Sequence, residues 1–117
     1  MNLTTFLQKI QHQHAISFDE TMAVIAEHYH YQATEFSNGL GEDKLTSAAG
    51  TNEGSCKIFA FAQLHHLTPE QTLNLFGDYY HLDDLHNPTA TDHQNIRLFM
   101  KYGWDGIQFQ NPALTPK

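Results

Sequence analysis

The sequence predicts a mainly α-helical fold, in which five helices form one compact domain over residues 1–117 with a possible minor two-stranded β-ribbon. Leu, Phe and Met together number 23, whereas Val and Ile number seven, so the β-branched residues that favour a large sheet are scarce. Apolar residues recur at helical spacing in several segments. Three segments also begin with the residue pair of an N-terminal capping box.

The first two helices are predicted near the N-terminus. Four apolar residues lie at positions i, i+3, i+4 and i+7 and so share one face of the first helix: Leu3, Phe6, Leu7 and Ile10. Ser17 and Glu20 have the spacing of a capping box, with Ser17 as the N-cap and Glu20 at N3. The second helix, which they open, has four further residues along one face: Phe18, Met22, Ile25 and Tyr29.

The third helix is predicted to begin near Asn52 or Ser55 and to end around His65 and His66. Its segment Ile58–Ala62 is apolar without interruption. A helix that is apolar nearly all round is buried on all sides, so we expect this helix at the centre of the fold.

The fourth helix is predicted from Thr68 as the N-cap, Pro69 at the first helical position and Gln71 at N3, and Gly77 is expected to end it. The fifth is predicted to start within Thr91–Gln94.

The end of the fifth helix is also marked in the sequence. Arg97 and Lys101 fall toward its negative end, and Gly103 is placed at C′. Trp104 is then expected to pack against Phe99, as residues at C″ often do with the last turn.

Two segments are not predicted as helices. Residues 30–51 contain several glycines and small polar residues, and we expect a long surface loop with one short strand around Gln32–Phe36. Residues 106–110 alternate apolar and polar side chains, which predicts a short strand. These two strands are expected to pair as the ribbon.

Composition narrows the classes of partner and site. The net charge of −7 repels phosphate backbones and anionic lipid, so we expect neither nucleic acid nor a membrane as a partner. A single cysteine excludes an internal disulfide and any zinc site built on two thiolates. The nine histidines include no pair at i, i+4, so no metal site is predicted, and no cofactor is expected. No signal or membrane anchor is recognisable, which favours the cytoplasm.

The start of the third helix is the first candidate site. Backbone N–H groups without partners and the positive end of the helix dipole meet there, which suits an anion or an activated thiol. The alternative is that the cysteine simply packs in the core as a small hydrophobic residue. The candidate residues are Asn52, Glu53, Ser55, Cys56 and Lys57.

A second candidate cluster lies at the end of the fourth helix and the start of the fifth. Asp92 and His93 could form an acid–base pair with a tyrosine hydroxyl, Tyr80 or its neighbour Tyr79, close to Asp78. The alternative is structural: Thr91 or Asp92 caps the helix, the tyrosines fill the core, and Arg97 pairs with a carboxylate. Asn38, in the long loop, is the remaining candidate for a common pocket.

Five runs of residues cover nearly the whole chain in order: Ser17–Ile25, Asn52–Phe61, Phe76–Tyr80, Thr91–Arg97 and Gly103–Gly106. Together these runs resemble the HopJ family, which is named for type III secretion effectors. The resemblance implies a protein of Gram-negative bacteria and, by the family name, delivery into a host cell. It implies no reaction, cofactor or catalytic residue.

Two classes of function remain open. The first is a non-enzymatic binding or effector-like protein, whose partner is another protein or a small anionic ligand. Its contact region would be the acidic surface and the loop at 37–51. The second is a small enzyme or ligand-binding protein with a pocket around Cys56, Glu53 and the Asp92–His93 region. The sequence favours the first class, because no complete catalytic constellation can be assembled from it.

Overall fold

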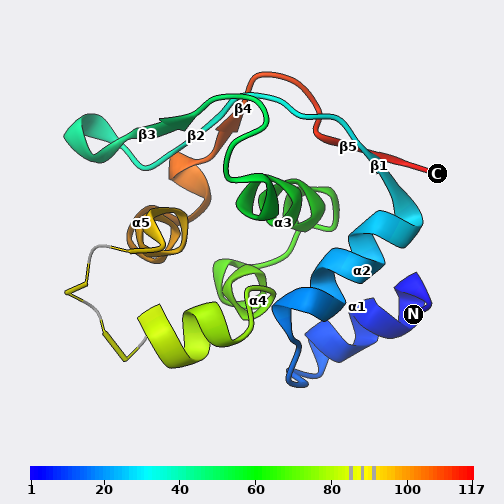
Figure 1. The fold of residues 1–117 in the computed structure, drawn as a ribbon. Helices are drawn as coiled ribbons and strands as arrows, with labels where there is room; N and C mark the ends of the chain where they lie inside the picture. The colour runs from blue at the N-terminus through cyan, green and yellow to red at the C-terminus, as the bar shows by residue number, and fades with distance from the viewer. Residues whose placement is uncertain (85, 88, 91) are drawn as a thin grey trace.

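A computed structural model describes residues 1–84, 86–87, 89–90 and 92–117 (Figure 1). Its five α-helices are α1 (Leu3–Gln11), α2 (Phe18–His28), α3 (Glu53–Leu64), α4 (Pro69–Asn74) and α5 (Gln94–Tyr102). The described strands are short: β1 (Tyr29–Tyr31), β2 (Phe36–Asn38), β3 (Leu45–Ser47), β4 (Gln108–Phe109) and β5 (Leu114–Pro116). The prediction of a mainly α fold with minor β-structure is therefore confirmed.

Helix α3 lies at the centre, with α2, α4 and α5 around it and the small sheets along one side (Figure 1). Ile58, Phe59, Phe61 and Ala62 are all fully buried in it. The apolar run that predicted a central helix is thus the middle of the hydrophobic core.

The N-terminal helices begin as predicted, with one difference in the capping. Ser17 Oγ accepts a hydrogen bond from the backbone N–H of Glu20 at 3.0 Å, so Ser17 is the N-cap of α2. The Glu20 carboxylate pairs with Lys9 Nζ of α1 at 2.7 Å. The Glu20 side chain therefore links the two helices, where a capping box would have it return to Ser17.

Helix α4 has the complete capping box that the sequence predicts, formed by Thr68 and Gln71 with Pro69 in the first turn. It ends at Asn74, and Gly77 follows with a φ of +60°. A π-helix, η2 (Tyr79–Asp84), comes directly afterwards. A Cβ on Gly77 would lie 2.8 Å from the backbone N of Phe18, so this glycine allows the turn to pack against the start of α2.

Helix α5 begins at Gln94 with His93 as its N-cap. The predicted cap Thr91 lies outside the described residues. At the other end Gly103 is the C-cap, with a φ of +59°. The predicted contact of Trp104 with Phe99 is confirmed, with the ring centroids 5.0 Å apart in an edge-on arrangement.

The β-structure is more extensive than the predicted ribbon. Strand β2 pairs antiparallel with β4, as expected for the loop and the tail, but also with β3, and β1 pairs with β5 in a second sheet. The strand predicted around Gln32–Phe36 is displaced, because β1 ends at Tyr31 and β2 begins at Phe36. The loop prediction missed β3 and the 3₁₀ turn η1 (Gly41–Asp43), which form a hairpin with β2.

Within the described residues, no helix combines the length and the apolar character that crossing a bilayer requires.

Candidate functional site

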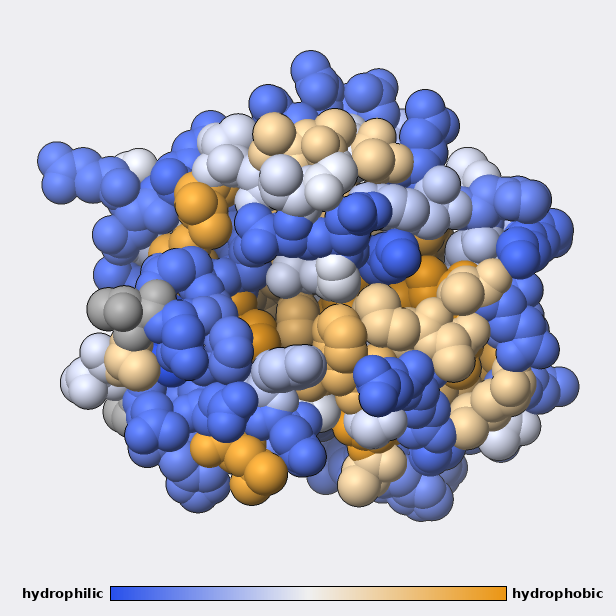
Figure 2. All heavy atoms as spheres, in the orientation of Figure 1, coloured by the Kyte–Doolittle hydropathy of each residue, from blue (hydrophilic) through white to orange (hydrophobic). Residues whose placement is uncertain are grey.

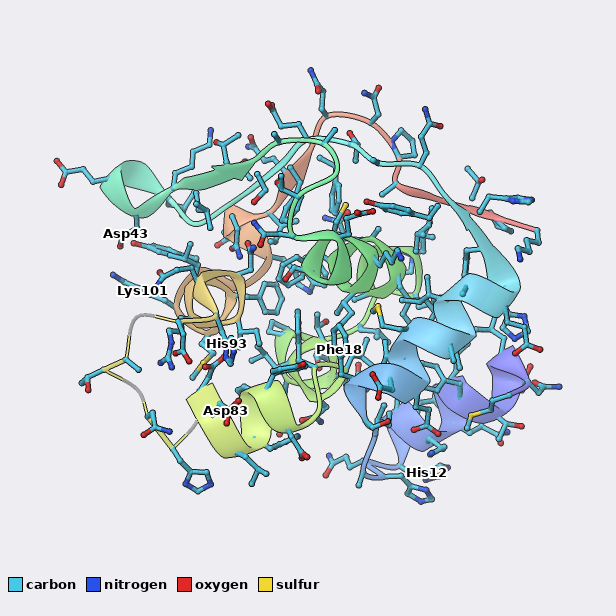
Figure 3. All side chains as sticks on the ribbon, in the orientation of Figure 1. His12, Phe18, Asp43, Asp83, His93 and Lys101 are labelled. Carbon is cyan, nitrogen blue, oxygen red and sulfur yellow. The ribbon has the colours of Figure 1, made fainter. Side chains whose placement is uncertain are left out.

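A pocket of about 550 Å³ opens between the first turns of α3 and α5, the start of α2 and η2. Figure 2 shows this face, where hydrophobic side chains lie in a central hollow with hydrophilic side chains above it and to its left. In Figure 3, His93 below α5 and Phe18 near the start of α2 lie on either side of this space. The described lining residues are Phe18, Leu45, Asn52, Gly54, Ser55, Phe76, Tyr79, His93, Gln94, Asn95 and Ile96.

The two helices that open on the pocket begin in the same unusual way. Their N-caps, Asn52 and His93, have left-handed backbones with φ near +50°, a region in which asparagine and histidine are enriched among non-glycine residues. Neither side chain caps its own helix. Asn52 Nδ2 donates to Ser47 Oγ at 3.0 Å, and His93 Nδ1 donates to Asp84 Oδ1 at 2.8 Å. The two N-cap side chains therefore do not accept from the first-turn N–H groups of their own helices, as N-cap side chains usually do.

Asp84, at the end of η2, anchors one side of the pocket. It is fully buried, and its Oδ1 accepts from His93 and from Arg97 Nη2, the latter at 2.9 Å. Arg97 also donates to the backbone carbonyls of Asn87 and Asp92 and to Asp92 Oδ1. Burial raises the pKa of Asp84, while His93 and Arg97 oppose the rise. This network fixes η2 and the segment after it to α5.

Asp84, Asp92 and His93 also form the group of described residues best placed to hold a metal ion, with ligand atoms within 4.8 Å of one another. Arg97 Nη2 already lies 2.9 Å from Asp84 Oδ1 and 2.8 Å from Asp92 Oδ1. The guanidinium thus supplies the positive charge that the two carboxylates need. We therefore interpret the cluster as an ion-pair network that shapes the pocket.

Asn38 lies behind the pocket and positions Asn95. The Asn38 side chain is fully buried, and its Nδ2 donates to the Asn95 backbone carbonyl at 2.8 Å and to Asn95 Oδ1 at 3.1 Å. Asn38 Oδ1 and Asp84 Oδ2 are the buried side-chain atoms without a hydrogen-bond partner in the described part of the chain.

The structure brings together only some of the predicted site residues. Asn52, Ser55 and His93 line the pocket, and Asn38 is linked to it through Asn95. Asp78 lies in a separate depression with Ser17 and Asp19. Five others do not line the pocket either: Glu53, Cys56, Lys57, Tyr80 and Asp92.

Cys56 lies in the core, and the activated thiol is not found. Its side chain is 1% exposed and interacts with Tyr31 and the backbone of Thr34. Burial raises the pKa of the thiol, whereas the sequence-based hypothesis required a lowered pKa. Lys57 Nζ lies over the Tyr31 ring, 4.7 Å from its centroid. The position matches the other interpretation of Cys56, a small hydrophobic residue of the core, because α3 turns Cys56 inward, away from the pocket at the helix start.

The predicted acid–base pair also has different partners. His93 Nδ1 is 3.9 Å from Asp92 Oδ2 but 2.8 Å from Asp84 Oδ1, so Asp84 is its carboxylate partner. Tyr79 meets His93 edge-on through its ring, at 5.4 Å between centroids. Sequence reasoning missed Asp84, Asn95 and Phe18 as site residues, whereas Tyr79, named as an alternative to Tyr80, does line the pocket. Phe18 and Asn95 lie in the first turns of helices whose starts were recognised, which was the available signal.

Comparison with known proteins gives a family and no activity. The family model described as HopJ type III effector protein matches residues 3–114. A solved structure titled "Crystal structure of unknown function protein VPA0580" is 46% identical, with a TM-score of 0.94, and the match covers 100% of this chain and 95% of that one. No curated protein matches. The chain belongs to the HopJ type III effector protein family.

Proposed function

We propose that this protein is a non-enzymatic binding protein that takes a small anionic ligand in the pocket between α3 and α5. The observation that carries the proposal is the convergence of two helix N-termini on one pocket, neither of them capped by the side chain of its N-cap residue. Helix starts favour anions, because their N–H groups and the positive end of the dipole face the ligand. The described lining includes no aspartate or glutamate that would oppose an anion.

The sequence also predicts binding to another protein, and this stays a prediction alongside the proposed anionic ligand. The bacterial cytoplasm is the proposed place of action, and delivery into a host cell rests on the family name alone.

The test is a titration of the ¹⁵N-labelled protein with inorganic phosphate, sulfate, acetate and benzoate, followed by amide chemical shifts. At least one anion is expected to give saturable shifts at Gly54, Ser55 and Asn95. The variant Ser55→Asp places a carboxylate at N3 of α3, where it satisfies the first-turn N–H groups itself, and is expected to abolish these shifts without loss of stability.

The matched control is Thr5→Asp, which adds the same charge at N3 of α1, on an exposed position. It is expected to leave anion binding unchanged. If none of the four anions gives saturable shifts at the three amides, the proposed function is wrong. Equal loss of binding in both variants would assign the effect to net charge and would also contradict the proposal.

A second candidate function, a small acid–base enzyme, is favoured by one observation. His93 lines the pocket, together with Ser55, and Asp84 holds its Nδ1, as a carboxylate orients the histidine of a hydrolytic site. Hydrolysis of p-nitrophenyl acetate tests it. If the protein is an enzyme, His93→Gln would lower the rate of hydrolysis at least tenfold, whereas His86→Gln, at an exposed position, would leave the rate unchanged. We expect no such difference, because the nine histidines give only a nonspecific background.

A further inference from the structure

The Asn95 side chain presents an unused donor to the pocket. Asn95 is 7% exposed and lines the pocket. The Asn38 Nδ2 donates to the Asn95 backbone carbonyl, which can only accept, so the orientation of the Asn38 amide is fixed. The Asn95 atom that faces Asn38 Nδ2 must then be Oδ1. Asn95 Nδ2 is left without a hydrogen-bond partner among the described residues. It is not one of the fully buried unpartnered atoms, so this donor is open to the pocket and can meet an acceptor of a ligand.

The wall beside the donors is apolar and aromatic. Phe18 and Tyr79 meet edge-on with their centroids 5.2 Å apart, and Phe76, Leu45 and Ile96 complete this part of the lining. A Cβ on Gly54 would lie 2.8 Å from Phe18 Cζ, so the Phe18 ring lies directly against the first turn of α3. Hydrogen-bond donors and an aromatic surface are therefore adjacent.

The size of the pocket excludes a bare inorganic ion as its complementary ligand. A volume of about 550 Å³ is in the range of small organic molecules. An inorganic anion fills the space of a few water molecules, at about 30 Å³ each, and would leave the aromatic wall in contact with water. Removing that apolar surface from water requires a ligand with an apolar body.

We infer that the ligand is an organic acid with a flat apolar body, whose carboxylate accepts from Asn95 Nδ2 and the first-turn N–H groups while its body packs against Phe18 and Tyr79. This inference rests on the proposed function and specifies its ligand class. We infer an acidic head group because the polar part of the lining offers hydrogen-bond donors, which a carboxylate can accept from. The flat body follows from the aromatic wall beside them.

The experiment compares four probes by calorimetry or NMR titration: benzoate, acetate, benzyl alcohol and inorganic phosphate. Benzoate is expected to bind at least tenfold more tightly than each of the others, because only benzoate has both a carboxylate and an aromatic body. Equal affinity for benzoate and for acetate or phosphate would overturn the ligand class and leave anion binding intact. Equal affinity for benzoate and benzyl alcohol would overturn both proposals.

Two variants test the parts of the site separately. Asn95→Asp keeps the oxygen that accepts from Asn38 and replaces the Nδ2 donor with a second oxygen. This variant is expected to bind benzoate at least tenfold more weakly and to bind benzyl alcohol with unchanged affinity. Asn111→Asp adds the same charge on an exposed residue away from the pocket and is expected to change neither the affinity for benzoate nor that for benzyl alcohol. Phe18→Ala is expected to remove the preference for benzoate over acetate. Unchanged benzoate affinity in Asn95→Asp or an unchanged preference in Phe18→Ala would contradict the inference.

Discussion

Replacing Phe59 with alanine is expected to cost about 3–5 kcal/mol of unfolding free energy, the range for loss of a core aromatic residue. Phe59 is fully buried in α3 and contacts four aromatic rings from other elements. The distances between ring centroids are 5.0 Å to Phe99, 5.7 Å to Phe76, 6.2 Å to Phe36 and 6.5 Å to Trp104. Deleting the ring leaves a cavity where β2, the segment after α4, and α5 meet. Urea denaturation followed by circular dichroism measures the loss.

Leu64→Ala, on the same helix, is the control for this variant. Leu64 is 47% exposed, so its truncation is expected to cost no more than about 0.5 kcal/mol, as for surface substitutions away from special features. A loss below about 1 kcal/mol for Phe59→Ala would show that α3 is not the centre of the core.

Local patterns predicted the helices well because each pattern reports a local cause. The Thr68–Gln71 capping box forms from residues within one turn, and the apolar run Ile58–Ala62 reports burial on all sides. The strands were predicted poorly because their pairing depends on distant partners. Tyr29 pairs with Pro116, a contact that no local pattern of two or three residues can indicate.

The candidate site shows the same limit. Asn52, Ser55 and His93 were predictable because they begin helices, and helix starts have recognisable sequence features. Asp84 was missed because its partners His93 and Arg97 are on another element, and its burial results from packing. Cys56 follows Ser55 directly but packs in the core, as one of its two interpretations expects, because a one-residue step along a helix rotates a side chain by about 100°.

The buried Asp84–Arg97 contact gives the second large expected effect. Arg97→Met keeps the aliphatic stem, removes the guanidinium, and is expected to cost about 3 kcal/mol at pH 7. This value is at the low end of the destabilisation measured when one partner of a buried ion pair is removed, because His93 still donates a hydrogen bond to Asp84. The side chains are 12% exposed for Arg97 and fully buried for Asp84, so water replaces the lost charge poorly. Lys101→Met is the control on the same helix: its partner Asp43 is exposed, as is Lys101 itself (Figure 3), so the loss of stability is expected to be a small fraction of that of Arg97→Met.

The pH dependence of the Arg97→Met effect distinguishes an unpaired charge from simple loss of packing. Burial raises the pKa of Asp84 in the folded protein, so its contribution to stability is complete below the pKa of the unfolded chain and is lost as the pH rises through the folded pKa. Without Arg97 the folded pKa rises further, and stability falls more steeply toward neutral pH. Asp92 adds to the same pH dependence. Arg97 lowers the pKa of Asp92, so the Arg97–Asp92 contact stabilises the wild type near neutral pH and this stabilisation is lost as the pH falls. The difference between wild type and Arg97→Met is therefore expected to be largest at pH 7 and clearly smaller at pH 4. A difference independent of pH would mean that Arg97 stabilises the α5 start by packing alone.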